Sequence, residues 1–220
     1  MGEVQRLPLF PLNTVLFPGM VLPLHIFEPR YRLMIGRCIQ ENTPFGVVLI
    51  REGVEVGGNA VPHEIGTSAY VINVERLPDG RMDISTVGHQ RYRVREIVEE
   101  RPFLIAAVED RPLQGIQSPD AERIAVRLSG VLRKYLDVLT RSVGLKLSAE
   151  QIPAENMPLA YFAATVLPIP PDEKQALLAI DDLPELLKTE YTLFKRENML
   201  LGQMIKQQQR GGTGSLFSAN

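Results

Sequence analysis

The sequence lacks several features that would point directly to a location or a chemistry. It contains a single cysteine, Cys38, and no tryptophan. One cysteine cannot form an internal disulfide, which favours a reducing compartment. No run approaches the roughly 18 apolar residues of a membrane span, and the first residues, MGEVQRLPLF, lack the charged and apolar regions of a signal peptide. We therefore expect a cytoplasmic protein without a membrane partner.

A strong charge of either sign is also missing. The 220 residues include 24 Lys and Arg and 26 Asp and Glu, a net charge of -2. This balance gives no general reason to expect nucleic acid or an anionic membrane as a partner. The hydrophobic fraction of 45% and the charged fraction of 23% are those of a soluble globular protein, and the length suits one large domain or two small ones.

Catalytic and cofactor-binding motifs are absent as well. Neither the GxxxxGK[ST] phosphate loop nor the GxGxxG dinucleotide fingerprint occurs. His63-Glu64 begins like a zinc-protease motif, but position 67 is Thr67 and not the second histidine ligand. We predict no catalytic residues, no metal site and no cofactor, and hence a protein that is not an enzyme. An enzyme that works without a recognisable motif is the lowest-ranked alternative.

The most distinctive feature present is the stretch of residues 7–31, LPLFPLNTVLFPGMVLPLHIFEPRY. Its prolines exclude a continuous helix, and burying each large apolar side chain is worth about 1.5–3 kcal/mol. The sequence therefore predicts short, buried, extended segments at Leu7–Phe10 and Val21–Phe27, with a tight turn at Pro18-Gly19.

The residues that follow favour a β-rich first half. Pro29 opens a helix that ends near Asn42, and Pro78-Asp79-Gly80 predicts a hairpin. Residues 52–62 are expected to form a loop. Further strands are expected over residues 45–50, 65–77, 82–86, 92–97 and 103–108. Roughly six or seven strands without long helices argue for a small barrel or sandwich.

Residues 111–119 mark a change from strands to helices. Ser118 is the candidate N-cap of a first helix that ends at Gly144, and Asp182 with Glu185 forms the capping-box pattern of a last long helix. Shorter helices are expected over residues 159–167 and 172–180. We interpret the chain as an α+β protein with a β subdomain (1–115), a helical-bundle subdomain (116–206) and a disordered tail (207–220).

Beyond these patterns, the sequence resembles the N-terminal substrate-binding domain of Lon proteases. The resemblance covers about residues 5–205, and the matching segments occur in the order of that family. They are Pro8-Leu9-Phe10-Pro11-Leu12, Val15-Leu16-Phe17-Pro18-Gly19, Leu22-Pro23-Leu24, Ile26-Phe27-Glu28-Pro29-Arg30-Tyr31, Gly66-Thr67, Asp79-Gly80, Gly88 with Arg91-Tyr92, and Lys174-Gln175-Ala176-Leu177-Leu178.

The resemblance implies both a fold and a role. The fold would be a small PUA-like β-barrel followed by an α-helical bundle. The role would be that of a non-catalytic module that engages polypeptide segments, either unfolded or tagged protein substrates or a protease or chaperone partner. A full-length Lon protease continues into an ATPase module and a serine–lysine peptidase. Because this sequence contains neither, it is similar to stand-alone Lon-domain proteins, and no protease activity is expected.

Under this interpretation the candidate polypeptide-binding residues are Phe17, Met20, Phe27 and Tyr31. A junction between barrel and bundle offers a groove, and an exposed sheet edge can accept an extended chain. Each of the four side chains is also suited to the core, which is the interpretation that residue type alone favours. Apolar loops of this density, if exposed, would also favour a homo-oligomer.

The alternative function is RNA binding, because PUA-like barrels often contact RNA. Its candidate residues are Arg91, Arg93 and Arg95, which alternate with Tyr92 and Val94 and could follow a phosphate backbone. The simpler interpretation, which we favour, is the exposed face of an amphipathic strand. The net charge also counts against a nucleic-acid partner.

Overall fold

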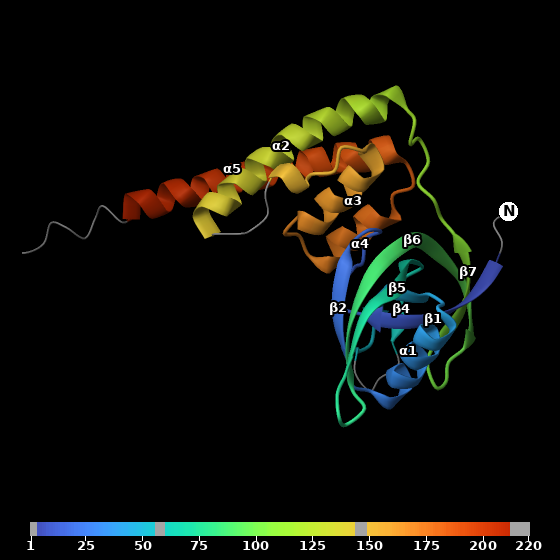
Figure 1. Cartoon of the computed structure of the whole chain (residues 1–220). Coiled ribbons are helices and arrows are strands. Elements are labelled where there is room, and N and C mark those ends of the chain that lie inside the picture. Colours follow the sequence, from blue (N-terminus) through green and yellow to red (C-terminus); the bar gives the residue numbers. More distant parts are fainter. Residues whose placement is uncertain (1–3, 56–59, 144–148, 212–220) are drawn as a thin grey trace, which may run out of the picture.

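The computed structural model describes residues 4–55, 60–143 and 149–211; for residues 141–143, 149 and 205–211 only the backbone is described. Strands and helices separate along the chain, as the sequence predicts. Figure 1 shows the strands and one short helix in one half of the molecule and the remaining helices in the other. The expected helix end at Gly144 and residues 212–220 of the expected tail lie outside the described residues. Residues 207–211 belong to the last helix, which corrects the predicted start of the tail at residue 207.

The elements of the two halves follow each other without mixing. The sheet half contains β1 (Val4–Leu12), β2 (Val21–Ile26), α1 (Pro29–Glu41), β3 (Phe45–Glu52), β4 (Val61–Pro62), β5 (Ile65–Arg76), β6 (Met82–Glu99) and β7 (Ile105–Asp110). The helical half contains α2 (Pro119–Val143), the short 3-10 helix η1 (Ala149–Gln151), α3 (Asn156–Val166), α4 (Pro171–Ala179) and α5 (Leu183–Gly211).

Five of the strands form a closed ring. Their order is β1–β7–β6–β5–β3, and a parallel pairing of β1 with β3, with Leu9 opposite Gly46, returns the sheet to its first strand. The short β4 pairs with β3, and β2 pairs with the first half of β6. The pairings other than β1–β3 are antiparallel, so the sheet is mixed.

The longest strand, β6, corrects the sequence analysis. Separate strands are predicted over residues 82–86 and 92–97, whereas Met82–Glu99 is one strand of 18 residues. Its first half lies between β2 and β5, and its second half lies between β7 and β5. β2 pairs only with the first half of β6, and β7 pairs only with the second half. Because no residue of positive φ interrupts the strand, β6 remains continuous across both parts of the sheet. The predicted hairpin before it is confirmed, with Gly80 at φ 82°.

Close backbone contacts hold the proline-rich loop against the sheet. The turn at Pro18-Gly19 is confirmed, because Gly19 has φ 80° and the N–H of Met20 donates to the carbonyl of Phe17 at 3.0 Å. A Cβ on Gly88 of β6 would lie 2.4 Å from the carbonyl oxygen of Phe17. Only glycine therefore permits the loop to approach β6 this closely.

Tyr92 of β6 fills the interior of the ring. It is buried with Leu9 of β1 and Val48 of β3, and its hydroxyl donates to the carbonyl of Val47 at 3.3 Å. Burial raises the pKa of the Tyr92 phenol far above its ordinary value. A Cβ on Gly66 would lie 2.4 Å from the hydroxyl oxygen, so the ring closes around Tyr92 only with glycine at this position.

Local capping sets the ends of the helices as the sequence predicts. α1 has Pro29 in its first turn and is capped at its other end by Asn42 in the left-handed conformation, φ 51°. Ser118 Oγ accepts a backbone N–H from the first turn of α2 at 3.2 Å. Asp182 Oδ2 accepts the N–H of Glu185 at 3.2 Å, which confirms the predicted cap of α5.

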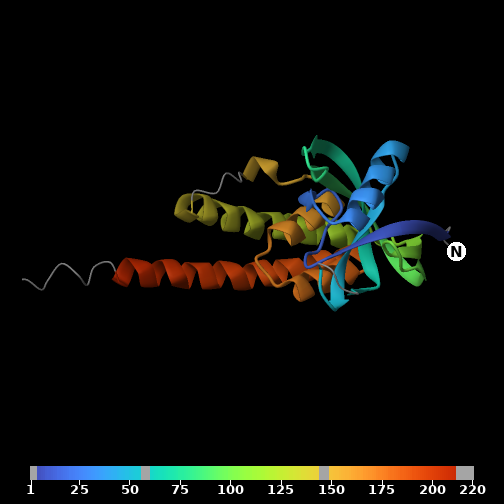
Figure 2. The same cartoon turned by 90° about the horizontal axis from the view of Figure 1, so that it is seen from below.

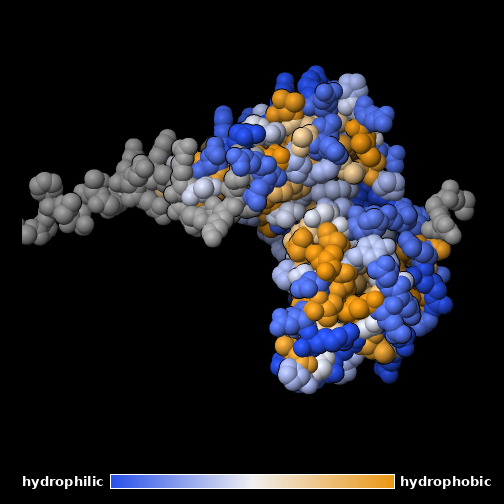
Figure 3. Space-filling model, in the orientation of Figure 1, coloured by the Kyte–Doolittle hydropathy of each residue, from blue (hydrophilic) through white to orange (hydrophobic). Residues whose placement is uncertain are grey.

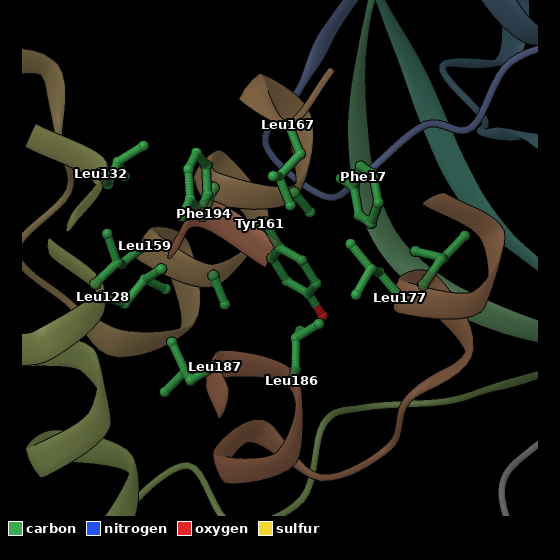
Figure 4. Close-up of a cluster of buried hydrophobic side chains, with 14 of the residues drawn as sticks. Phe17, Leu128, Leu132, Leu159, Tyr161, Leu167, Leu177, Leu186, Leu187 and Phe194 are labelled. Atoms are coloured by element: carbon green, nitrogen blue, oxygen red, sulfur yellow. The ribbon is translucent and has the colours of Figure 1, made fainter. Parts of the chain in front are cut away.

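The helical half packs on one end of the ring through a shared apolar core. α2 and α5 lie side by side and extend away from the sheet (Figure 1, Figure 2). Figure 4 shows Phe17, from the loop between β1 and β2, pointing toward Tyr161 of α3 and Leu177 of α4. The ring centroids of Phe17 and Tyr161 are 6.5 Å apart. One buried cluster therefore joins the two halves.

A carboxyl group interrupts this core. Glu190 lies on α5 between Leu187 and Phe194 and is 0% exposed. Neither of its carboxylate oxygens has a hydrogen-bond partner among the described residues. Burial raises the pKa of Tyr161 of α3, and the nearby Glu190 carboxylate adds to this rise. Burial raises the pKa of Glu190 well above its ordinary value, because an unpaired charge is strongly disfavoured away from water.

We expect Glu190→Gln to stabilise the protein increasingly as the pH rises. The contribution of Glu190 to stability is fully present below the ordinary glutamate pKa of about 4.3. As the pH rises from there to the raised pKa of the folded state, the free energy of unfolding falls by about 1.4 kcal/mol per pH unit, and the contribution is lost. The amide does not titrate. The gain in free energy of unfolding should therefore be small near pH 4 and large near pH 8, as measured by urea denaturation.

The control is Glu185→Gln, which replaces an exposed carboxylate in the first turn of the same helix. This variant should keep the pH dependence of the wild-type protein. A gain from Glu190→Gln that does not change with pH would contradict the role assigned to the buried carboxyl.

Candidate functional site

The four residues predicted to bind polypeptide divide into two groups. Phe17 and Tyr31 are 0% and 5% exposed, so in this structure they belong to the core and not to a surface. Met20 is partly buried and packs against both the core of the helical half and the core beneath α1. Phe27 directly follows β2 and is 44% exposed. Of the four, Met20 and Phe27 are accessible to a partner.

Phe27 borders a three-stranded ribbon formed by β2, the first half of β6 and the second half of β5. The register places Val21 of β2 opposite Val87 of β6, and Val87 opposite Tyr70 of β5. Successive residues of a strand point to opposite faces, and burial alternates along the first half of β6 accordingly. The inward face carries Ile84 into the core beneath α1. Val21, Val87 and Tyr70 therefore share the outward face.

Apolar side chains gather on this outward face. Val21 is 54% exposed, and Phe27 stacks on the outward residue His25, with ring centroids 5.9 Å apart. Figure 3 shows an area of hydrophobic surface on the sheet half, close to the helices. We define the ribbon face as Val21, Pro23, Phe27, Tyr70 and Val87, all of which are exposed or partly exposed.

A polar cluster borders the ribbon face near the hairpin. His25 Nδ1 lies 2.5 Å from Asp83 Oδ1, and Arg81 Nη1 lies 3.5 Å from His25 Nε2. Asp79 accepts the backbone N–H of Arg81 at 3.0 Å, and this hydrogen bond holds the pKa of Asp79 below its ordinary value. Phe27 therefore offers an apolar contact directly beside polar and charged side chains.

The ribbon also ends in an unpaired strand edge. β2 pairs with β6 on one side, and among the described residues no strand pairs with its other side. Pro23 lies in this strand, and proline is typical of edge strands because it has no N–H to donate. An apolar face beside a sheet edge is suited to contact an extended chain.

Sequence reasoning misses Val21, Tyr70 and Val87 as surface residues. The segment VLPLHI of β2 is apolar almost throughout, which indicates burial on both faces; in the structure its odd-numbered positions are exposed. The signal that could have revealed the outward face is the polar–apolar alternation in the first half of β6, since its register aligns the outward residues of β2 and β5.

Arg91, Arg93 and Arg95 do not form one exposed row. This corrects both the RNA alternative and the exposed strand face that the sequence favours. Arg91 is 2% exposed. Its guanidinium donates to the carbonyls of Arg111 at 3.1 Å, Leu178 at 2.7 Å and Ile180, and to Asp181 Oδ1 at 3.2 Å. Burial lowers the pKa of Arg91, and the Asp181 carboxylate opposes this shift. Arg91 thus links β6 to the segment that follows α4.

The two remaining arginines are close to acidic side chains. Arg93 is partly buried, with its Nε 3.9 Å from Glu64 Oε2. Arg95 is exposed, and its Nη2 lies 2.5 Å from Glu109 Oε1. These neighbours reduce the positive charge that β6 presents to a phosphate backbone.

We expect Arg91→Ala to lower the free energy of unfolding by about 3–5 kcal/mol, because it leaves buried polar groups without their donor. The control is Arg95→Ala, which removes a partly exposed ion pair worth less than about 1 kcal/mol. Urea denaturation of both variants measures the difference. Equal losses would contradict the structural role of Arg91.

Other chemistry is sparse in the parts of the chain that the structure describes. Cys38 is a buried free thiol, and burial raises its pKa, which makes it a poor nucleophile. Within the described ranges, no three His, Cys, Asp or Glu side chains are grouped so that they could hold a metal ion. None of the helices described here combines the length and apolar composition needed to cross a membrane.

The structure thus combines a mixed sheet closed into a ring, a helical half docked on one end of the ring and an apolar face beside an open strand edge. The profile of the ATP-dependent protease La (LON) substrate-binding domain matches residues 6–196. The chain belongs to this family, which confirms the resemblance found in the sequence.

Curated relatives extend well beyond the matched region. The chain is 30% identical over 210 residues to Lon protease 2 of Syntrophobacter fumaroxidans, covering 93% of this chain and 26% of that protein. It is 28% identical over 202 residues to Lon protease 2 of Myxococcus xanthus, covering 90% and 24%. The chain thus spans about a quarter of the length of these relatives.

Solved structures support the same fold. The Lon N-terminal domain protein from Xanthomonas campestris is similar with a TM-score of 0.59 and 26% identity, covering 84% of this chain and 96% of that one. The N-terminal domain of a Mycobacterium avium complex Lon protease has a TM-score of 0.67 and 17% identity, covering 87% and 98%. At this lower identity the second likeness concerns the fold alone.

Proposed function

We propose that this chain is a non-catalytic module that binds polypeptide segments through the ribbon face. The observation that carries the proposal is the set of exposed apolar side chains, among them Val21 and Phe27, beside the unpaired edge of β2. Membership of a family described as a substrate-binding domain supports the same role. The occupant would be an unfolded or tagged protein substrate, or a protease or chaperone partner.

The physical basis is the removal of apolar surface from water. Each Å² of apolar surface that a bound chain covers contributes about 25 cal/mol, and an extended segment can also donate to and accept from the β2 edge. Phe27 adds a ring beside the charged cluster at His25 and Asp83. The face would therefore favour apolar segments that also carry a polar or charged residue.

The proposal includes the finer interpretation of the architecture. The ring would be a PUA-like barrel formed by residues 1–115, and the helices that follow from residue 116 would form a helical bundle. The location would be the cytoplasm. The match to the substrate-binding domain over residues 6–196 supports a binding role for these residues.

We expect the double variant Val21→Ser/Phe27→Ser to weaken binding of fluorescein-labelled, reduced and carboxymethylated α-lactalbumin by about tenfold or more. The reason is the loss of apolar contact, since tenfold corresponds to about 1.4 kcal/mol. Fluorescence anisotropy measures the dissociation constant. The matched control is Val126→Ser/Met199→Ser, which removes residues 72% and 59% exposed on the helical half.

Three outcomes would overturn the proposal. They are an absence of binding by the wild-type protein, equal affinity of wild type and ribbon variant, and equal losses in both double variants. Self-association is a competing function of the face, and sedimentation velocity of the wild type and the ribbon variant tests it. A dimer of the wild type that dissociates in the variant would assign the face to self-association.

RNA binding is the weaker alternative, because Arg91 is buried and Arg95 is paired. We expect no gel shift of a single-stranded 20-nucleotide RNA at micromolar protein and low salt, where contacts to the phosphate backbone are strongest. A shift that Arg93→Ala/Arg95→Ala abolishes would favour the RNA alternative.

A further inference from the structure

A groove of about 330 Å³ lies between β1 and α1, which Figure 1 shows next to each other. Its floor is apolar and buried: Met34 and Phe103 are 0% and 4% exposed, and the side chain of Cys38 lies on the buried face of α1. Four consecutive residues of β1, Gln5–Pro8, line one side. Because consecutive side chains of a strand point to opposite faces, a wall made of consecutive residues is the edge of the strand itself.

This edge of β1 has no partner strand. From Val4 to Pro8, β1 pairs with β7 on one side. On the other side, pairing with β3 begins at Leu9, and the residue before β3 is Pro44, which has no N–H to donate. Among the described residues, no strand therefore lies beside the first half of β1 on the side of α1.

The hydrogen-bond pattern shows which main-chain groups face the groove. The N–H of Leu9 donates to the carbonyl of Leu104 at 2.8 Å, in the register of the β1–β7 pairing. Hydrogen-bonded and non-bonded pairs alternate along antiparallel strands, so the odd-numbered residues of β1 bond to β7. The N–H and C=O groups of Val4 and Arg6 consequently point away from β7.

We propose that this groove binds an extended polypeptide segment, which pairs with the main chain of Val4 and Arg6 as an added strand and places an apolar side chain against Met34, Cys38 and Phe103. This is a second binding site, separate from the ribbon face, and it recognises the main chain as well as a side chain. An extended polypeptide is the occupant because it carries N–H and C=O groups at the strand spacing that the edge repeats.

The β1 edge has a cavity beside the strand. Side-chain pockets next to an accepting edge are the feature that gives strand addition its specificity. The opposite rim is formed by Arg37 and Glu41 of α1, both exposed. The added strand would therefore lie between a neutral main-chain edge and a charged helix face.

The test compares Arg6→Pro with Arg6→Ala. Proline removes the N–H of residue 6 and blocks the edge, whereas alanine keeps the N–H and removes only the exposed side chain and its ion pair with Glu99. Proline is compatible with the fold here, because Pro8 already occupies an equivalent outward position of β1. The probe is a fluorescein-labelled ten-residue peptide that alternates Thr with Val and has one central Phe.

We expect Arg6→Pro to raise the dissociation constant of the peptide about tenfold, and Arg6→Ala to change it less than about threefold. A second measurement is amide hydrogen exchange by NMR in the wild-type protein. The Arg6 amide should exchange rapidly without peptide and become protected at saturation, while the Leu7 amide is protected in both states. This measurement does not depend on how well a variant folds.

The outcomes separate the two proposals. Equal affinity of the two Arg6 variants, or an Arg6 amide that stays unprotected at saturation, overturns the strand-addition site. If binding is then lost in Val21→Ser/Phe27→Ser, the ribbon-face function stands without it. If the wild-type protein binds neither the peptide nor the unfolded protein, both proposals fail.

Discussion

The buried guanidinium of Arg91 fixes how the two halves of the chain meet. Its N–H groups donate to backbone carbonyls on both sides of the junction, so separating the halves would break several charge-assisted hydrogen bonds at once. Arg111 binds both carboxylate oxygens of Asp181, and Gln175 of α4 donates to the first residue of β5 at 3.0 Å. The helices are thereby held on one end of the ring, and the ribbon face and the β1 groove remain open.

Local signals in the sequence are sufficient for the order of elements. Pro29 and Asn42 bound α1, and Asp182 caps α5, because capping depends on residues within one turn. The extent of β6 could not be predicted in this way. Its continuity depends on two different neighbours that the strand acquires only in the folded sheet, and Gly88, which looks like a break, serves the close approach of the Phe17 loop.

The candidate site was less predictable than the fold, for a related reason. Phe17, Tyr31 and Phe27 have similar side chains in one short stretch, yet two are buried and one is exposed. The difference depends on what packs against each residue: Phe17 lies in the core shared with the helices, and Tyr31 of α1 lies in the core beneath that helix. Arg91 and Arg95 differ in the same way, although charge alone suggests that both are exposed. Residue type indicates what a side chain can do, whereas register and packing decide whether a partner can reach it.

The two proposed surfaces would select polypeptides by different rules. The ribbon face offers side-chain contacts, so its affinity should follow the apolar content of the bound segment. The β1 edge offers the main-chain groups of Val4 and Arg6, because Pro8 lacks an N–H and pairing with β3 begins at the next residue. Each such hydrogen bond contributes about 0.5–1.5 kcal/mol net, which limits strand addition to a short and reversible contact. The charge of Arg6 and the ring of Pro8 also restrict uncontrolled pairing at this edge.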